Sequence, residues 1–154
     1  MTEGDIAIAP DARTGTLGKE QGFQFAETHA KEVRVMKGRR NWMEYLDYGV
    51  TDATNGRMRA QRIIVTGKTQ GTGWHYHLCE MQFVYLFGGY IVFQLEDGRT
   101  LRLEAGDTVF IPGGFKHTEI DISEDFDCLE VSVPSNLGTV ACDMPEIWRD
   151  RAVA

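Results

Sequence analysis

Short stretches of alternating hydrophobic and polar residues fill the chain from residue 74 onward. They predict strands near residues 74–79, 82–87, 90–96, 99–104, 107–111, 115–121 and 126–133. Turn residues separate these stretches, for example Gly88-Gly89, Asp97-Gly98 and Pro112-Gly113-Gly114. Short strands with turn signals about every 8–12 residues are typical of a β-sandwich or β-barrel. The pattern therefore predicts an all-β fold for this part of the chain.

The pattern is weaker in the first third of the chain. Residues 1 to about 22 are polar and lack periodicity, which is typical of a terminal arm. Apolar and small residues between Phe25 and Met36 recur at helical spacing and predict a short helix. Within the same segment, Val33-Arg34-Val35 alternates like a strand, so the strand alternative stays open.

Two further strands and a terminal helix complete the prediction. Trp42–Val50 and Met58–Thr66 are predicted strands, and the loop that joins them contains the turn signal Asn55-Gly56. Asp143–Arg151 predicts a short C-terminal helix, because an Asp is a good N-cap and a Pro is tolerated in the first turn. No internal repeat or linker divides the 154 residues, so we expect a single domain.

Composition and charge narrow the classes of partner. The formal net charge of −7 argues against a nucleic-acid partner, which would require a basic face. The small basic cluster of Lys37, Arg39 and Arg40 is expected to be a solvated loop. The chain has no apolar stretch of about 20 residues and no signal-like start, so we expect no membrane partner and a cytoplasmic location. The three cysteines are then expected to be free thiols.

Three histidines are spaced as ligands of a metal ion. His75 and His77 are two residues apart in a predicted strand, so both imidazoles lie on the same face, about 6–7 Å apart along the strand. His117 can approach them from a neighbouring strand. Imidazole is a suitable ligand for zinc, copper, iron and nickel. The sequence therefore predicts a site for one divalent transition metal ion.

Two motifs resemble those of the cupin superfamily over roughly residues 60–133. The first is His75-Tyr76-His77, four residues, Gln82, six residues and Gly89. The second is Gly106, five residues, Pro112-Gly113-Gly114, two residues, His117, three residues and Asp121. The resemblance implies an all-β fold, a double-stranded β-helix or jelly-roll barrel at residues 58–154. Residues 1–57 would then be an N-terminal arm with one or more added strands rather than a separate domain. The resemblance also implies that His75, His77 and His117 hold the metal, with Gln82 as a fourth or labile ligand.

Gln82 stands where cupins usually have a ligating glutamate. An amide would leave a divalent centre at net charge +2 instead of +1, which favours an anionic substrate and a stronger Lewis acid. The alternatives are that Gln82 binds no metal, or that Glu80 replaces it. Strand alternation places Glu80 on the face opposite His77, which argues against that replacement.

Three acids near the motifs have open roles. Glu130 is a charge within the apolar run Leu129–Val133, so it either faces solvent or lines the cavity as a base or hydrogen-bond partner. Glu119 and Asp121 are either hydrogen-bonding partners of His117 or surface acids. Alternation alone does not decide between these alternatives, because the inward face of each strand is unknown.

The resemblance implies a metal-dependent enzyme acting on a small molecule. The first hypothesis is a dioxygenase with iron as the first choice of metal, or nickel, manganese or copper, and a small anionic or chelating enol, diketone or aromatic substrate. The second is a non-oxidative Lewis-acid enzyme, such as a cyclase, isomerase or lyase, for which zinc is the expected metal. The third is a ligand-binding barrel without enzymatic activity. A homodimer is expected, since two-fold dimers are the commonest oligomers.

Overall fold

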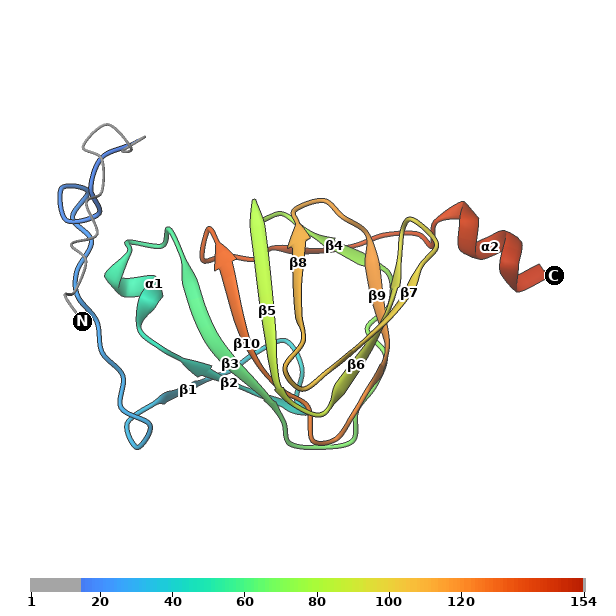
Figure 1. Ribbon diagram of the computed structural model, residues 1–154, viewed down its shortest axis with the longest axis horizontal. Coiled ribbons are helices and arrows are strands. Elements are labelled where there is room, and N and C mark those ends of the chain that lie inside the picture. Colours follow the sequence, from blue (N-terminus) through green and yellow to red (C-terminus); the bar gives the residue numbers. More distant parts are fainter. Residues whose placement is uncertain (1–14, 154) are drawn as a thin grey trace, which may run out of the picture.

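Two antiparallel sheets face each other in the computed structural model, which describes residues 15–153 (Figure 1). One sheet has six strands in the order β1 (Arg34–Met36), β2 (Met43–Asp47), β3 (Arg59–Val65), β10 (Asp127–Val133), β5 (Met81–Gly88) and β8 (Thr108–Pro112). The other has five strands in the order β11 (Thr139–Ala141), β4 (His75–His77), β9 (His117–Ile122), β6 (Tyr90–Leu95) and β7 (Thr100–Glu104). Strands distant in the sequence are thus neighbours, as in a jelly roll. The all-β prediction is confirmed.

The hydrophobic core lies between the inner faces of the two sheets. Burial alternates along most strands, so one face of each strand packs inward and the other meets solvent. The buried cluster draws on both sheets, with Leu86 on β5, Phe93 on β6 and Cys128 on β10 among its members. Burying side chains of this size stabilises the fold by about 1.5–3 kcal/mol each.

The N-terminal third extends the six-stranded sheet. β2 pairs with β3 from Met43 opposite Val65 to Asp47 opposite Gln61, and β1 pairs with β2. The helix predicted between Phe25 and Met36 is wrong, because the end of that segment forms β1. Pairing with β2 satisfies the backbone there and overrides the weak helical spacing. The arm predicted for residues 1 to about 22 lies largely outside the described residues.

Two short helices complete the fold. α1 (Val50–Ala53) is a single turn in the loop between β2 and β3, and Asn55 and Gly56 follow it with positive φ angles of 51° and 81°. α2 (Glu146–Val153) confirms the predicted C-terminal helix. It projects from the β6–β7 side of the molecule (Figure 1). Among the described residues, neither helix is long and apolar enough to cross a membrane.

Candidate metal centre

His75 and His77 on β4 and His117 on β9 meet on the inner face of the five-stranded sheet. His75 and His117 are paired across the two strands, and the ring centroids of the three imidazoles lie 4.4–5.2 Å apart. One nitrogen from each ring lies within 4.8 Å of the others, and all three side chains are buried. The structure therefore brings together the three histidines that the sequence singled out.

The Nδ1 atom of each imidazole already has a hydrogen-bond partner. His75 Nδ1 lies 2.8 Å from the Gly73 carbonyl, His77 Nδ1 3.0 Å from Thr139 Oγ1, and His117 Nδ1 2.9 Å from the Phe115 carbonyl. Because carbonyl oxygens only accept, Nδ1 of His75 and His117 carries the proton and Nε2 has the free lone pair. His117 Nε2 is buried without a hydrogen-bond partner among the described residues. Imidazoles that are held by a hydrogen bond at Nδ1 and have a lone pair at Nε2 are suited to bind a metal ion.

Burial favours the neutral form of two of these imidazoles, those of His77 and His117. Desolvation, followed by the neighbouring His117 and His75, lowers the pKa of His77 to about 3. Desolvation also lowers the pKa of His117, although Glu119 opposes the shift. A neutral imidazole is the form that binds a metal, so the lone pairs are available at neutral pH.

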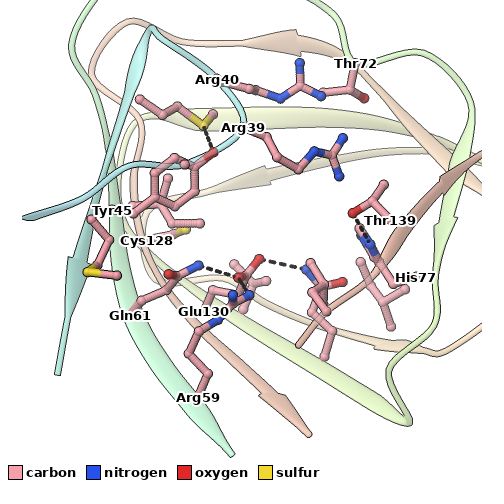
Figure 2. A pocket seen from close by; sticks show the side chains of 18 of the residues that line it. Arg39, Arg40, Tyr45, Arg59, Gln61, Thr72, His77, Cys128, Glu130 and Thr139 are labelled. Carbon is pink, nitrogen blue, oxygen red and sulfur yellow. Dashed lines mark hydrogen bonds and ion pairs between the residues drawn. The ribbon is translucent and has the colours of Figure 1, made fainter. Parts of the chain in front are cut away.

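A polar network lies on the opposite sheet and faces the cavity (Figure 2). Glu130 on β10 is only 7% exposed. Its Oε1 accepts hydrogen bonds from Arg59 Nη2 (3.1 Å) and Gln61 Nε2 (2.8 Å), and its Oε2 accepts one from Gln82 Nε2 (2.9 Å). The alternative in which Glu130 faces solvent is therefore wrong. Arg59 and Gln61 were not predicted from the sequence. They lie two residues apart on β3, so alternation could have placed them on the same face.

Gln82 lies on β5 with its amide held by this network. The Nε2 group donates to Glu130, while Oε1 is buried and has no hydrogen-bond partner among the described residues. Both Gln82 and the histidines of β4 line the same cavity. The Gln82 Oε1 atom is thus available in that cavity to accept a hydrogen bond or to bind a metal ion. Glu80 is exposed, as strand alternation predicts.

Glu119 on β9 is a half-buried acid beside the histidines. Its Oε1 lies 3.8 Å from His117 Nε2 and its Oε2 lies 3.9 Å from His75 Nε2. The Thr72 hydroxyl donates a hydrogen bond to the same carboxylate. Asp121 on the same strand is exposed, and its carboxylate accepts a hydrogen bond from the Tyr90 hydroxyl (3.1 Å). Of the two acids considered as partners of His117, Glu119 adjoins the histidines and Asp121 does not.

The cavity between the sheets has a volume of about 710 Å³ and a cationic rim. Lys37, Arg39 and Arg40 line it from the loop between β1 and β2, so the expected solvated loop is also a cavity wall. Figure 2 shows Arg39 and Arg40 extending across the cavity toward Thr139 and Thr72. The guanidinium of Arg39 contributes to the lowered pKa of His77, which agrees with this placement.

The second motif supports the histidine strand through its turn. The Gly114 N–H donates to the His77 carbonyl (2.8 Å), and the Gly113 N–H donates to the Glu80 carbonyl (3.1 Å). A Cβ atom at Gly113 would collide with the carbonyl oxygen of Cys79. Glycine is therefore needed at this close approach of two backbones.

Comparisons with known proteins agree with this architecture. Residues 62–133 match the profile of the family described as "Cupin domain". The polyketide cyclase RemF from Streptomyces resistomycificus is 18% identical, with a TM-score of 0.63 over 85% of this chain and 94% of that chain. The Streptomyces nucleoside dehydratase Pac13 is 14% identical, with a TM-score of 0.56 over 81% of this chain and 96% of that chain.

A structure reported for the DMSP lyases RdDddP and RnDddQII is 19% identical, with a TM-score of 0.55 over 74% of this chain and 64% of that chain. No curated protein sequence matches the chain significantly. At these identities the structural likeness establishes a shared fold. The family match identifies residues 62–133 as a cupin domain, and the chain has the cupin fold.

Proposed function

We propose that this cupin is a metal-dependent enzyme that catalyses a non-oxidative reaction on a small anionic molecule. His75, His77 and His117 would hold one divalent transition metal ion, and Gln82 Oε1 would be an additional oxygen donor. The observation that carries the proposal is the convergence of three buried imidazoles, with their Nδ1 atoms occupied, beside one large cavity that His75 and His77 line. Such an ion supplies a Lewis acid that polarises a carbonyl or hydroxyl oxygen.

The surrounding residues would orient the substrate and manage protons. Three hydrogen-bond donors fix Glu130, and Glu130 in turn fixes the amide of Gln82, so we assign Glu130 a positioning role. Burial, followed by the charge of Glu130, raises the pKa of Tyr45, which also lines the cavity. Its phenol therefore stays protonated at neutral pH and is a hydrogen-bond or proton donor toward a bound molecule.

The non-oxidative alternative is favoured by the relatives that share the fold. These are named as a polyketide cyclase, a nucleoside dehydratase and DMSP lyases. Cyclisation, dehydration and elimination need no external oxidant. The dioxygenase hypothesis, with iron as its metal, receives no comparable support from these relatives.

The cationic rim supports an anionic substrate. Arg34 and Arg59 are paired with Asp47 and Glu130. The described residues provide no such carboxylate partner for Arg39 or Arg40, although both line the cavity. A carboxylate or phosphate at the rim would complete bidentate hydrogen bonds with these guanidinium groups. The protein as a whole carries a net charge of −7, so this local excess of positive charge is a specific feature.

We further propose a cytoplasmic homodimer. All three cysteines are free, which suits a reducing compartment. β1 is an edge strand with exposed Val35 and Met36, and an apolar edge of this kind suits pairing with a second copy. Light scattering on the full-length protein tests the dimer, and a monomer at micromolar concentration would contradict it.

Anaerobic turnover tests the proposed reaction class. Protein reconstituted with zinc or cobalt is incubated with small hydroxy acids and keto acids in sealed, oxygen-free vials, and products are identified by mass spectrometry. The proposal predicts loss of water, cleavage or isomerisation without oxygen, and no product with a His75→Ala variant. Product formation that requires and consumes oxygen would contradict it.

A further inference from the structure

Glu119 carries a half-buried carboxylate at a position to which the two cupin motifs give no role. Both of its oxygens face the histidines, one toward His117 and the other toward His75. Two donors bound to one zinc ion at about 2.0–2.2 Å lie at most about 4.3 Å apart. The separations of 3.8 and 3.9 Å from the Nε2 atoms fall within that span. Glu119 is therefore within reach of an ion bound to His75 or to His117, through a different carboxylate oxygen in each case.

Regular alternation from His117 turns Glu119 toward the histidines, and an irregularity in β9 just after it turns Asp121 away. The pairing of β6 with β9 shifts between Val92 and Phe93, so that Val92 lies opposite Asp121 and Phe93 lies opposite Glu119. Ile120 is the extra residue. His117 and Glu119 keep the inward parity, whereas Ile120 and Asp121 are exposed and Ile122 is buried again. Bulges commonly redirect side chains next to functional sites.

The Thr72 hydroxyl holds the carboxylate in place. Its Oγ1 donates to Glu119 Oε2, and the Glu119 backbone N–H donates to the same Oγ1 (3.0 Å). The Thr72 N–H donates to the Glu119 carbonyl (3.0 Å), so the loop before β4 is joined to β9 at this residue. These contacts connect the loop that leads into His75 with the strand that carries His117.

We propose that Glu119 is an anionic ligand of the metal, replacing the carboxylate that Gln82 lacks. This inference rests on the proposed metal site. The carboxylate would then come from β9 instead of β5, two residues after a histidine ligand. The centre would have a net charge of +1 with a divalent ion, so the anionic character of the substrate rests on Arg39 and Arg40.

Glu130 explains why the carboxylate ligand would come from position 119 and not from position 82. Gln82 Nε2 donates to Glu130 Oε2 at 2.9 Å, so a glutamate at position 82 would place two buried carboxylates in contact. Two like charges at that distance are strongly unfavourable unless a proton is shared. Because Glu130 makes a carboxylate at position 82 unfavourable, a negative ligand of the metal would come from a strand other than β5. Among the described residues, Glu119 has oxygens that approach two of the three histidines.

Cobalt binding and its visible spectrum test the assignment. Full-length wild-type, Glu119→Gln and Asp121→Asn proteins are titrated with Co²⁺ against a chelating dye. The Asp121→Asn variant is the matched control, because it removes the same charge from the same strand outside the cavity. Outer partners of metal ligands change affinity by about 10–100-fold. We expect Glu119→Gln to weaken binding by more than about 100-fold and to change the d–d spectrum, and Asp121→Asn to change neither.

Other outcomes separate this inference from the metal site itself. If wild-type protein binds one cobalt ion and Glu119→Gln binds it with the same spectrum, whatever the affinity, Glu119 is not a ligand and the inference is overturned. If wild-type protein binds no cobalt, the proposed metal site fails as well. A Glu119→Asp variant provides a second test should Glu119→Gln fail to fold. Its carboxylate is one methylene shorter, and we expect a changed spectrum and weaker binding; an unchanged spectrum would again exclude ligation.

Discussion

At the scale of single residues, the amide at position 82 is explained by its neighbour Glu130. The carboxylate of Glu130 accepts from Arg59, Gln61 and Gln82, and each of these contacts crosses between neighbouring strands. A buried carboxylate is tolerated only when donors surround it. Position 82 therefore has to supply a donor, which an amide does and a carboxylate does not.

We predict that Gln82→Glu destabilises the metal-free protein by about 1–3 kcal/mol at pH 7, because it replaces a donor by a second charge. Urea unfolding measures the change. The double variant Gln82→Glu/Glu130→Gln exchanges the amide and the carboxylate and should recover part of the loss. Strictly additive effects of the two substitutions would contradict the direct contact.

The buried histidines predict a pH dependence of stability. The pKa of His77 is lowered to about 3 in the folded protein, whereas an unfolded histidine has a pKa near 6.5. Between these values the unfolded chain binds a proton that the folded protein does not, so stability is complete above about pH 6.5 and declines as pH falls toward 3.

Urea unfolding of metal-free protein at pH 7.5 and pH 5 checks this prediction. We expect the free energy of unfolding to be lower at pH 5, and the difference to shrink in His77→Asn. His29 is exposed and serves as the control, since His29→Asn should leave the difference unchanged. An equal decline in wild type and His77→Asn would argue that other groups cause it.

The inward face of β4 was predictable, but the partners of its histidines were not. Parity places His75 and His77 on one side of any strand, and a third histidine in a recognised motif completes the set. The orientation of Glu130 required knowledge of which face of β10 turns inward. Alternation from His117 puts Glu119 on the inward face, but the bulge that turns Asp121 outward leaves no mark in the sequence, so the two acids could not be told apart. Thr139 lies on β11, a strand too short to produce a pattern.

At the scale of elements, α2 is attached to the strand beside the metal centre. The Trp148 indole N–H donates to the Leu95 carbonyl (2.7 Å), and Leu95 on β6 is paired with His117 on β9. Arg151 Nη1 donates to the Gly98 carbonyl (2.6 Å) in the β6–β7 turn. The helix is therefore attached to one end of the five-stranded sheet.

We predict that Trp148→Phe lowers stability by about 1 kcal/mol, since it removes one hydrogen bond while keeping an aromatic ring. For a chain of this size, the melting temperature should fall by about 2–4 °C. Arg149→Ala on the exposed side of the same helix is the control. A melting temperature equal to that of wild type would show that the indole contact does not stabilise the helix.

Element prediction succeeded where strands are long and failed where tertiary pairing decides. The strands from β4 to β10 follow clear alternation between turn residues, and each was found within two residues of its ends. Of the three-residue strands, β4 was found from its motif and β1 was left open as an alternative by the alternation at Val33-Arg34-Val35, whereas only pairing with β4 defines β11. The expected helix before β2 had helical spacing without a cap or an adequate apolar face.

At the scale of the whole molecule, the charge distribution separates the cavity rim from the rest of the surface. The protein is acidic overall, while Lys37, Arg39 and Arg40 gather at the entrance to the cavity. A local positive field of this kind attracts anions, and salt weakens the attraction. The rim and the metal centre together would select molecules with a charged end and an oxygen that binds the metal.

We predict that zinc-loaded protein binds oxalate, used as a small dianionic probe, and that Arg39→Ala/Arg40→Ala weakens this binding about tenfold or more. Calorimetry at two salt concentrations should also show a weaker salt dependence in the double variant. Arg99→Ala is the control, because Arg99 is exposed and paired with Asp97 in the β6–β7 turn. Unchanged affinity and salt dependence in the double variant would exclude the rim as an anion site.

The central claim is that His75, His77 and His117 hold one metal ion. The most direct test is elemental analysis of protein purified without a histidine tag, beside His77→Ala and His29→Ala variants. We expect one divalent transition metal ion per chain in wild type and in His29→Ala, and its loss in His77→Ala. Wild-type protein that holds no metal even after reconstitution, or a His77→Ala variant that holds as much as wild type, would show that these histidines are not the ligands.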